Sequence, residues 1–336
     1  MKKFMKPAVI IFGSMLLLAG CTTQKATDTK DKAQGHVSST VKIGYVDVTG
    51  KAQISDTLGI ASDKGYIQEE LDKIGVKSEL VPFTGAGPAI NEALASKSID
   101  IGILGDVPAI VGKASGIDTQ LFVASGSNNT AAFLVPADST ARSVKDFKGK
   151  KIATQKGSYM HRILIKMLEA NGLTVNDVQF VNMTAQDAAT AFLGKGVDAI
   201  VVGGVVEAKL VLNKNAKVLL DTSNNPEWVG ASAGVVRTEY AKENPETVSA
   251  VIKALDKAKQ LTISDSTAAK AQWVKAGNTN ETYDFLYPKN DYRYNVEITA
   301  DYISKIKDVE KFLKDNNLIK NDVDVDTWIN NSYYKK

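Results

Sequence analysis

Ser158 and His161 stand three positions apart in the stretch of the sequence whose residue types are best suited to chemistry. A serine and a histidine on one helix face could act as a nucleophile and its base. Gly157 comes directly before Ser158, and a glycine-containing turn at a helix start also suits the binding of an anion by free backbone N–H groups. The residues therefore allow two interpretations, a hydrolytic site or an anion-binding site.

The elements on either side of this stretch define it as a strand-to-helix turn. Residues 151–154 have the composition of a short strand, and the apolar residues of 163–168 fall at helical spacing. Ser158 is a favourable N-cap, and Asn171 with Gly172 is a typical C-terminal stop. The positive end of the helix dipole then lies at this turn, which favours a negative charge in front of it.

Residue counts argue against an enzyme. The chain of 336 residues has one cysteine, Cys21, and two histidines, His36 and His161. It contains no Gly-x-Ser-x-Gly elbow and no acid that is clearly placed to orient His161, so we expect no catalytic residues. We also expect no metal and no cofactor, because a zinc site needs more ligands than these. A net charge of +3 without a basic block predicts no nucleic-acid binding.

The first forty residues have the pattern of an exported lipoprotein. Lysines precede an apolar run over residues 7–19 that is too short to span a bilayer comfortably. The run closes with Leu18-Ala19-Gly20-Cys21, which resembles the lipobox of bacterial lipoproteins. This resemblance implies a signal peptide over residues 1–20 and a diacylglyceryl thioether on Cys21, with palmitate-type chains that anchor the protein. Residues 21–40 are polar and predict a flexible tether.

Two further glycine-rich turns follow predicted strands. The turn at residues 84–88 follows a strand predicted at 78–83, and the turn at 105–108 follows a strand predicted at 99–104. A helix follows each turn, and Asp106 is a candidate N-cap. Alternating strands and helices predict a parallel sheet, in which ligands bind beyond the carboxyl ends of the strands.

The sequence predicts two lobes joined by two crossovers. Apolar residues 130–135 predict the strand that leaves the first lobe, and residues 228–236 predict the strand that returns to it. We therefore expect hinges at Val135-Pro136 and at residues 235–237. The predicted lobe boundaries are 41–135 with 237–336 for the first lobe, and 136–236 for the second.

The order of these motifs resembles the solute-binding lipoproteins of ABC importers, in the sulfonate, taurine and nitrate branch. The resemblance covers the chain from about residue 41 to the mid 260s. The matching pieces are Ile43-Gly44-Tyr45, Phe83-Thr84-Gly85-Ala86-Gly87-Pro88, Ser98-Ile99-Asp100-Ile101-Gly102, Gly105-Asp106-Val107-Pro108, Val144-Lys145-Asp146-Phe147-Lys148-Gly149-Lys150-Lys151-Ile152-Ala153, Gln155-Lys156-Gly157-Ser158 with His161, Ala185-Gln186-Asp187-Ala188 and Gly196-Val197-Asp198-Ala199.

This resemblance implies an α/β fold of the two-lobed periplasmic-binding-protein type (type II), with two mixed sheets flanked by helices. It implies a monomeric receptor outside the cytoplasm, lipid-anchored to the cell membrane, that captures a small organic anion such as a sulfonate between its lobes. The receptor would deliver this anion to the permease subunits of an ABC importer. The residues expected to contact the ligand are Thr84, Gly85, Gly87, Gly105, Asp106, Gly157, Ser158, Tyr159, His161 and Glu207.

The residues after the strand predicted at 199–202 leave the identity of the ligand undecided. Many members of the family have Trp-Asp-Pro at this place, whereas this chain has Gly203-Gly204-Val205-Val206-Glu207. The cleft wall is therefore expected to be smaller there and to carry one acid. Nitrate, or a pyrimidine-type ring that hydrogen-bonds to His161 and Glu207, is an alternative to a sulfonate.

The sequence allows two interpretations for each of two aromatic features. Trp228 fits the cleft wall or the packing of a lobe equally well. The aromatic-rich residues 283–294 are interpreted as a loop that packs on the first lobe near the mouth of the cleft. A surface for carbohydrate or nucleic acid is the alternative for this segment.

Overall fold

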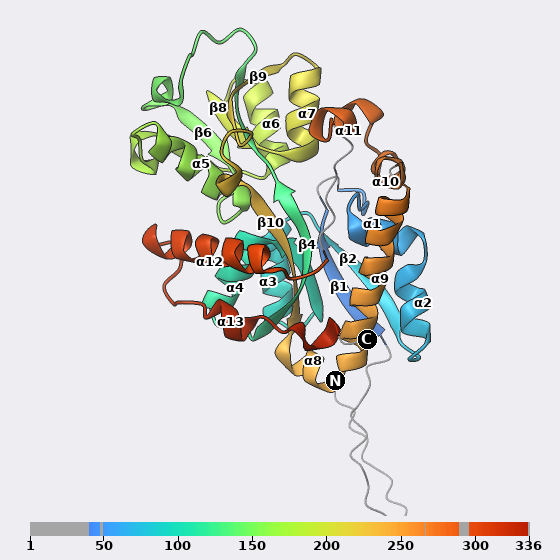
Figure 1. Cartoon of the computed structure of the whole chain (residues 1–336). Helices are drawn as coiled ribbons and strands as arrows, with labels where there is room; N and C mark the ends of the chain where they lie inside the picture. The colour runs from blue at the N-terminus through green and yellow to red at the C-terminus, as the bar shows by residue number, and fades with distance from the viewer. Residues whose placement is uncertain (1–39, 48–49, 266, 289–295, 335–336) are drawn as a thin grey trace, which may run out of the picture. The chain divides into compact units, whose positions relative to one another are not determined.

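The computed structural model describes residues 40–47, 50–265, 267–288 and 296–334, whose strands form two five-stranded sheets (Figure 1). In spatial order, the first sheet consists of β2 (Lys77–Phe83), β1 (Thr40–Val46), β3 (Ile101–Gly105), β10 (Gly230–Arg237) and β4 (Thr119–Asn129). The second consists of β7 (Gln179–Asn182), β6 (Lys151–Thr154), β8 (Ala199–Val202), β5 (Ala132–Pro136) and β9 (Ala216–Asp221).

Helices cover both sheets, and among the described residues no helix is long and apolar enough to span a membrane. The α-helices are α1 (Thr57–Asp63), α2 (Tyr66–Asp72), α3 (Ala86–Ala95), α4 (Asp106–Ala114), α5 (Tyr159–Ala170), α6 (Ala185–Leu193), α7 (Gly204–Leu212), α8 (Thr238–Glu243), α9 (Pro245–Ser264), α10 (Ala268–Lys275), α11 (Asn280–Leu286), α12 (Ala300–Asp315) and α13 (Val325–Trp328). Short 3-10 helices occupy Val144–Phe147, Val175–Asp177, Pro226–Trp228 and Asn331–Tyr334.

Both sheets mix parallel and antiparallel pairs, as predicted. Strand β1 runs parallel to β2 and β3, and β6 runs parallel to β7 and β8. Strands β5 and β10 run antiparallel to their neighbours. The parallel pairs arise because a helix separates each strand from the next, so the chain returns to the same end of the sheet before each new strand.

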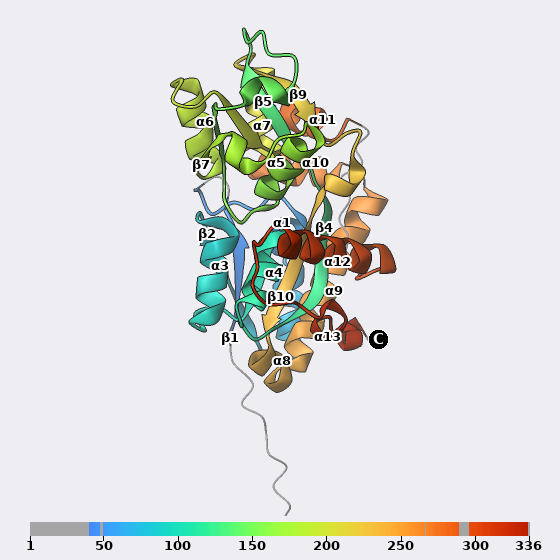
Figure 2. The ribbon, with the colours of Figure 1, turned by 90° about the vertical axis from the view of Figure 1, so that its left-hand side faces the viewer.

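The first sheet is buried on both faces. On one face Ile43 and Tyr45 of β1 pack with Val251 of α9. On the other face Leu104 of β3 packs with Ile306 of α12, which lies across α4 (Figure 2). Burial on both faces explains the apolar run of β3, because neither side of that strand meets water. The first lobe is therefore built on this sheet, and the second sheet with α5, α6 and α7 forms the second lobe.

The two predicted crossover positions were wrong. Strand β5 pairs with β8 and β9, so residues 132–135 belong to the second lobe, and the chain crosses between Asn129 and Ala132. Strand β10 pairs with β3 and β4, so residues 230–236 belong to the first lobe, and the return crossover comes before Gly230. An apolar strand pattern predicts a buried strand, but only pairing with distant strands decides which sheet contains it.

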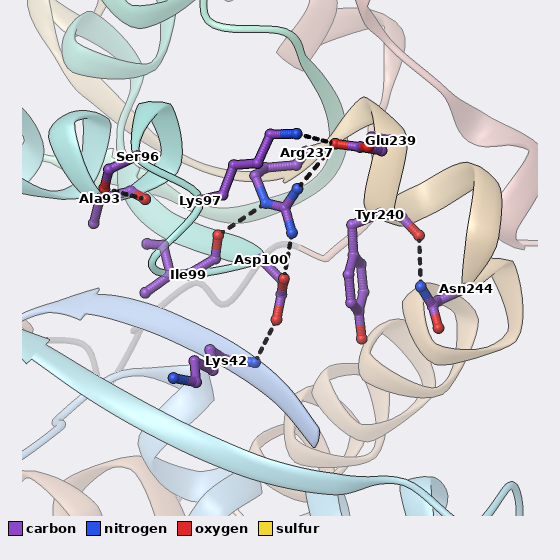
Figure 3. Close-up of polar contacts among 10 residues, drawn as sticks. All are labelled: Lys42, Ala93, Ser96, Lys97, Ile99, Asp100, Arg237, Glu239, Tyr240 and Asn244. Atoms are coloured by element: carbon purple, nitrogen blue, oxygen red, sulfur yellow. Dashed lines mark hydrogen bonds and ion pairs between the residues drawn. The ribbon is translucent and has the colours of Figure 1, made fainter. Parts of the chain in front are cut away.

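A polar cluster fixes the far end of the returning strand to the first lobe, as Figure 3 shows. Nη2 of Arg237, the last residue of β10, lies 2.6 Å from Oδ1 of Asp100, and its Nε donates to the Ile99 carbonyl at 3.1 Å. The other oxygen of Asp100 accepts from the backbone N–H of Lys42 on β1 at 2.9 Å. Three chain segments are thereby joined at the end of the sheet, which makes the first lobe a stable base for the returning strand.

Some predictions lie outside the described residues. These are the signal peptide over residues 1–20, the lipidation of Cys21, the tether over 21–40 except Thr40, which begins β1, and residues 289–294 of the aromatic-rich segment.

Candidate functional site

A cavity of ≈ 680 Å³ lies between the two lobes. This volume falls within the roughly 300–1,000 Å³ that is usual for small-molecule sites. Its lining includes turns at the carboxyl ends of strands in both sheets, which is where a parallel sheet is expected to bind ligands. The first lobe contributes Thr84, Gly85, Gly87 and Gly105, and the second contributes Gln155, Ser158, Tyr159 and Thr184.

Six helix starts meet at this cavity. The N-cap residues of α1, α3, α4, α5, α6 and α7 all line it, and these are Asp56, Gly85, Gly105, Ser158, Thr184 and Gly203. Each helix directs the positive end of its dipole and its first N–H groups toward its N-terminus. In the described structure no side chain caps α3 or α7, so their first N–H groups are left for water or a ligand.

The start of α3 has an uncommon backbone shape that strengthens its anion-binding character. Gly85 has φ −72° and ψ 5°, and Ala86 follows with φ 55°, which is the left-handed region. A right-handed residue followed by a left-handed one points successive N–H groups into a common concavity, an arrangement that binds anions. An alanine pays roughly 1–2 kcal/mol to adopt the left-handed region, and such strain is characteristic of functional sites.

The predicted N-cap of α5 is confirmed. The hydroxyl of Ser158 accepts from the His161 backbone N–H at 3.3 Å and donates to the Gln155 carbonyl at 2.7 Å. The Gln155 side chain donates from Nε2 to the Gly85 carbonyl at 3.3 Å, so it joins the α5 turn of the second lobe to the α3 turn of the first. The two turns that the sequence singled out therefore face each other across the cavity.

His161 lies away from the cavity. It is 5% exposed and packs against Phe180 of β7, with 5.0 Å between the ring centroids. Burial, assisted by the charge of Lys156, lowers the pKa of His161 to about 4, so its imidazole is neutral near pH 7. The Ser158 hydroxyl hydrogen already points to a backbone carbonyl, so this pair is not arranged as a nucleophile and its base.

Asp106 is a structural residue rather than the predicted N-cap and ligand contact. Gly105 is the N-cap of α4, and Asp106 is the first helical residue, completely buried and absent from the cavity lining. Its two carboxylate oxygens accept from the backbone N–H groups of Val107 at 2.7 Å and Ala231 at 2.8 Å. Burial raises the pKa of Asp106, and the charge of Arg162 acts in the opposite direction. Asp106 therefore ties the α4 turn to the returning strand.

Glu207 and Gly157 are also behind the cavity wall rather than on it. Glu207 is 8% exposed in the first turn of α7, and its Oε2 has no hydrogen-bond partner within the described residues. Burial, with the charge of Asp221, raises the pKa of Glu207 to about 8, so this side chain is largely neutral at pH 7. Gly157 adopts φ 74° in the turn before Ser158, a conformation that favours glycine.

Tyr159 does line the cavity, as predicted. Burial and the nearby charges of Glu207 and Asp106 raise the pKa of its phenol, so the hydroxyl stays protonated and can donate a hydrogen bond. Trp228 is 8% exposed in the core of the second lobe, which assigns it to packing.

The charged side chains of the cavity are all acidic. Asp47, Asp56 and Asp187 contribute to the lining, and no lysine, arginine or histidine of the described ranges does so. An anion in this cavity would consequently be held by backbone N–H groups and neutral donors. The described residues contain no group of three or more His, Cys, Asp or Glu side chains that could hold a metal ion.

Sequence reasoning missed several lining residues. Asp47 and Asp56 belong to the turn after β1, and its place at the carboxyl end of a strand was a usable signal. Trp273 and Tyr287 come from the C-terminal part of the chain. The expected position of residues 283–294 near the mouth of the cleft fits Tyr287, but the expected loop is wrong for residues 283–286, which belong to α11. No local signal indicated that Trp273 reaches the cavity.

The fold and the cavity between its lobes define a periplasmic-binding-protein fold, and comparison with known proteins places the chain within a family. Residues 57–269, more than half of the chain, match the family model described as NMT1/THI5 like, and the chain belongs to this family. A Bacillus subtilis (strain 168) protein named for the binding of aliphatic sulfonates is 28% identical over 334 residues, which cover 98% of this chain and 96% of the relative.

Solved structures agree with this assignment. The periplasmic aliphatic sulphonate binding protein SsuA from Escherichia coli superposes with a TM-score of 0.71 at 26% identity, over 89% of this chain and 95% of its own. The desulfurization enzyme DSZB also has a TM-score of 0.68, but its 16% identity over 88% of this chain and 97% of its own shows the fold alone. Because one fold serves a binding protein and an enzyme, the function has to be argued from the site.

Proposed function

We propose that this protein is the extracytoplasmic solute-binding receptor of an ABC importer and that its ligand is a small organic sulfonate. The observation that carries the proposal is the convergence of six helix starts on one cavity between the lobes, five of which have a glycine, serine or threonine rather than a carboxylate at the N-cap. Helix starts bind anionic oxygens through N–H groups that are fixed in place, so they do not need a cationic side chain. The named relatives support a sulfonate as the anion.

Closure of the lobes would trap the ligand and present one shape to the permease. The structure has the contacts expected of a closed form. Gln155 joins the two lobes through the Gly85 carbonyl, and Val205 of α7 packs in the hydrophobic core cluster of the first lobe that includes Trp273. We place the hinges in the two crossovers, residues 130–131 and 222–229, because these connect the sheets. The receptor acts as a monomer that docks onto the permease subunits.

The alternative ligands and activities have less support. A pyrimidine-type ring held by His161 and Glu207 would need both side chains in the cavity, and both lie behind its wall. Nitrate has four heavy atoms and would leave most of a cavity of ≈ 680 Å³ to water. A Ser158–His161 hydrolase lacks the hydrogen bond from the hydroxyl to the imidazole within the described structure.

Ligand binding should raise the thermal stability of the purified full chain. By mass action, a ligand at 100 times its Kd adds about 2.7 kcal/mol to the free energy of unfolding. We expect this effect from linear alkanesulfonates of two to six carbons, measured by calorimetry of binding and by thermal unfolding. Carboxylates of equal chain length are the matched control, since they offer two oxygens to the helix starts instead of three. Stabilisation by a pyrimidine or nitrate, with none from any sulfonate, would overturn the proposal.

We further propose that Cys21 carries the lipid anchor that keeps the receptor at the outer face of the cytoplasmic membrane. The support is the lipobox-like sequence Leu18-Ala19-Gly20-Cys21 after an apolar run. In cells, Cys21→Ser should shift the protein from the membrane fraction to the soluble fraction. The intact mass of the protein that retains Cys21 should include a diacylglyceryl group. If the protein that retains Cys21 is found in the soluble fraction and lacks this added mass, the anchor is excluded.

A further inference from the structure

Tyr159 has contacts that its place in the cavity lining does not explain. It is the first residue of α5, and its side chain lines the cavity. The same side chain packs against the hydrophobic cores of both lobes, the core that contains Leu104 in the first lobe and the core that contains Phe133 in the second. A side chain that is shared by two lobes in this way has surroundings that depend on the angle between them.

The return crossover enters the first lobe directly against the ring of Tyr159. A Cβ added at Gly230, the first residue of β10, would lie 2.8 Å from Cβ, 3.1 Å from Cγ and 3.2 Å from Cδ2 of Tyr159. The side chain therefore rests on the Gly230 backbone, which requires a residue without a side chain. The N–H group of the next residue, Ala231, donates to Asp106 at 2.8 Å, so this part of the chain is fixed to the first lobe.

The hydroxyl end of Tyr159 reaches the other crossover. A Cβ added at Gly203, the N-cap of α7, would lie 2.1 Å from the Thr130 carbonyl oxygen and 2.9 Å from the Tyr159 hydroxyl oxygen. Thr130 belongs to the crossover at residues 130–131, so the absence of a side chain at Gly203 gives room to this crossover and to Tyr159 together. We call Gly203 and Gly230 the glycine socket of Tyr159.

Helix α5 also holds the return crossover at a second point. Arg162 follows Tyr159 by three positions and is 3% exposed. Its Nη2 donates to the carbonyls of Trp228 at 2.8 Å and Val229 at 3.2 Å, the last two residues before Gly230. Because α5 is bonded to the crossover up to Val229, a rotation of the first lobe has to change the direction of the chain at Gly230. The space that the socket gives to the ring then changes as well.

We propose that Tyr159 couples ligand binding to closure of the lobes, and this inference rests on the sulfonate-receptor function proposed above. A sulfonate that accepts a hydrogen bond from the Tyr159 hydroxyl fixes the ring in the glycine socket, where the two crossovers have the arrangement of the closed form. In the open form the crossovers are rotated and the socket no longer fits the ring. A ligand shifts such an equilibrium only through its different affinities for the two forms, and the contact with Tyr159 supplies this difference.

Gly230→Ala tests the coupling from outside the cavity, because Gly230 is not among the lining residues. The added Cβ displaces the ring and makes the closed form less populated, which weakens apparent binding in proportion. We expect calorimetric titration of the full chain with an alkanesulfonate to give a Kd at least tenfold higher. Gly102→Ala is the matched control, since its Cβ would lie 2.7 Å from Cγ2 of Ile90, in the same sheet but away from Tyr159. Its Kd should stay within threefold even where its melting temperature falls.

Two substitutions of Tyr159 separate contact from coupling. Energy transfer between dyes on Glu92→Cys of α3 and Glu169→Cys of α5, both exposed positions, measures closure in a Cys21→Ser background. Tyr159→Phe keeps the ring, so its Kd should rise while saturating sulfonate still gives the full change in transfer. Tyr159→Leu removes the ring, so saturating sulfonate should give less than half of that change.

Three results overturn the inference and leave the receptor intact. They are full closure of Tyr159→Leu, a Gly230→Ala variant whose Kd equals that of the Gly102→Ala control, and sulfonate binding by the unmodified chain without a change in transfer. If the unmodified chain binds no alkanesulfonate, the proposed function itself fails.

Discussion

Gly87→Ala should weaken sulfonate binding by about 10- to 100-fold. A Cβ at Gly87 would lie 2.3 Å from Cγ and 2.4 Å from Cβ of Pro108, whose ring cannot rotate away. The start of α3 must therefore move, and with it the N–H groups of Gly85, Ala86 and Gly87 that we assign to the anion. Hydrogen bonds to a charged group contribute about 1.5–3 kcal/mol, and the loss of one such bond corresponds to this weakening of Kd.

Gly105→Ala is the matched control for this prediction. Gly105 also lines the cavity at a helix start, but its added Cβ would meet Cδ of Pro108 at 3.5 Å, an ordinary van der Waals contact. Its φ of −73° and ψ of 161° suit alanine. Titration calorimetry should give a Kd within about threefold of the unmodified chain. Unchanged binding by Gly87→Ala, with a melting temperature that falls as overpacking predicts, would show that the α3 turn does not hold the ligand.

Asp106→Ala should lower the free energy of unfolding by about 3 kcal/mol. The substitution leaves the backbone N–H groups of Val107 and Ala231 without their acceptor in a completely buried place. Each unsatisfied buried donor costs about 1–3 kcal/mol. The charge of Arg162, which acts on Asp106, also loses its nearby carboxylate. Denaturant unfolding measures the difference.

Asp106→Asn distinguishes this structural role from the ligand contact that the sequence suggested. Asparagine keeps the shape and one acceptor oxygen, so it should lose about half as much stability as alanine. Because Asp106 is absent from the cavity lining, the sulfonate Kd of the Asn variant should change by less than about threefold. A large loss of sulfonate affinity in the Asn variant, with a near-normal free energy of unfolding, would show that Asp106 contacts the ligand and would contradict the structure.

The acidic side chains of the cavity do not exclude an anionic ligand. The helix starts of α3 to α7 supply fixed positive potential, whereas the carboxylates of Asp47 and Asp56 already accept hydrogen bonds from backbone N–H groups. A cationic side chain at the helix starts would bind other anions as well, so its absence from the described lining favours selectivity over raw affinity.

The sequence by itself determined the local chemistry of the site. Gly85, Gly105 and Ser158 were identified as turns before helices, and the structure places all three at the cavity. This was possible because glycine conformations, N-caps and hydrophobic periodicity depend on residues a few positions apart. The parallel pairing of β1, β2 and β3 also followed from the alternation of strands and helices.

Only the tertiary structure decided which side chains share the cavity. In the tertiary structure, strand β5 belongs to the second sheet, and the ring of His161 packs against Phe180. Trp273 and Tyr287 line a cavity whose other walls come from earlier parts of the chain. The sequence could not show these outcomes, because strand pairing and helix docking depend on the packing of distant surfaces, whose complementarity no local pattern encodes.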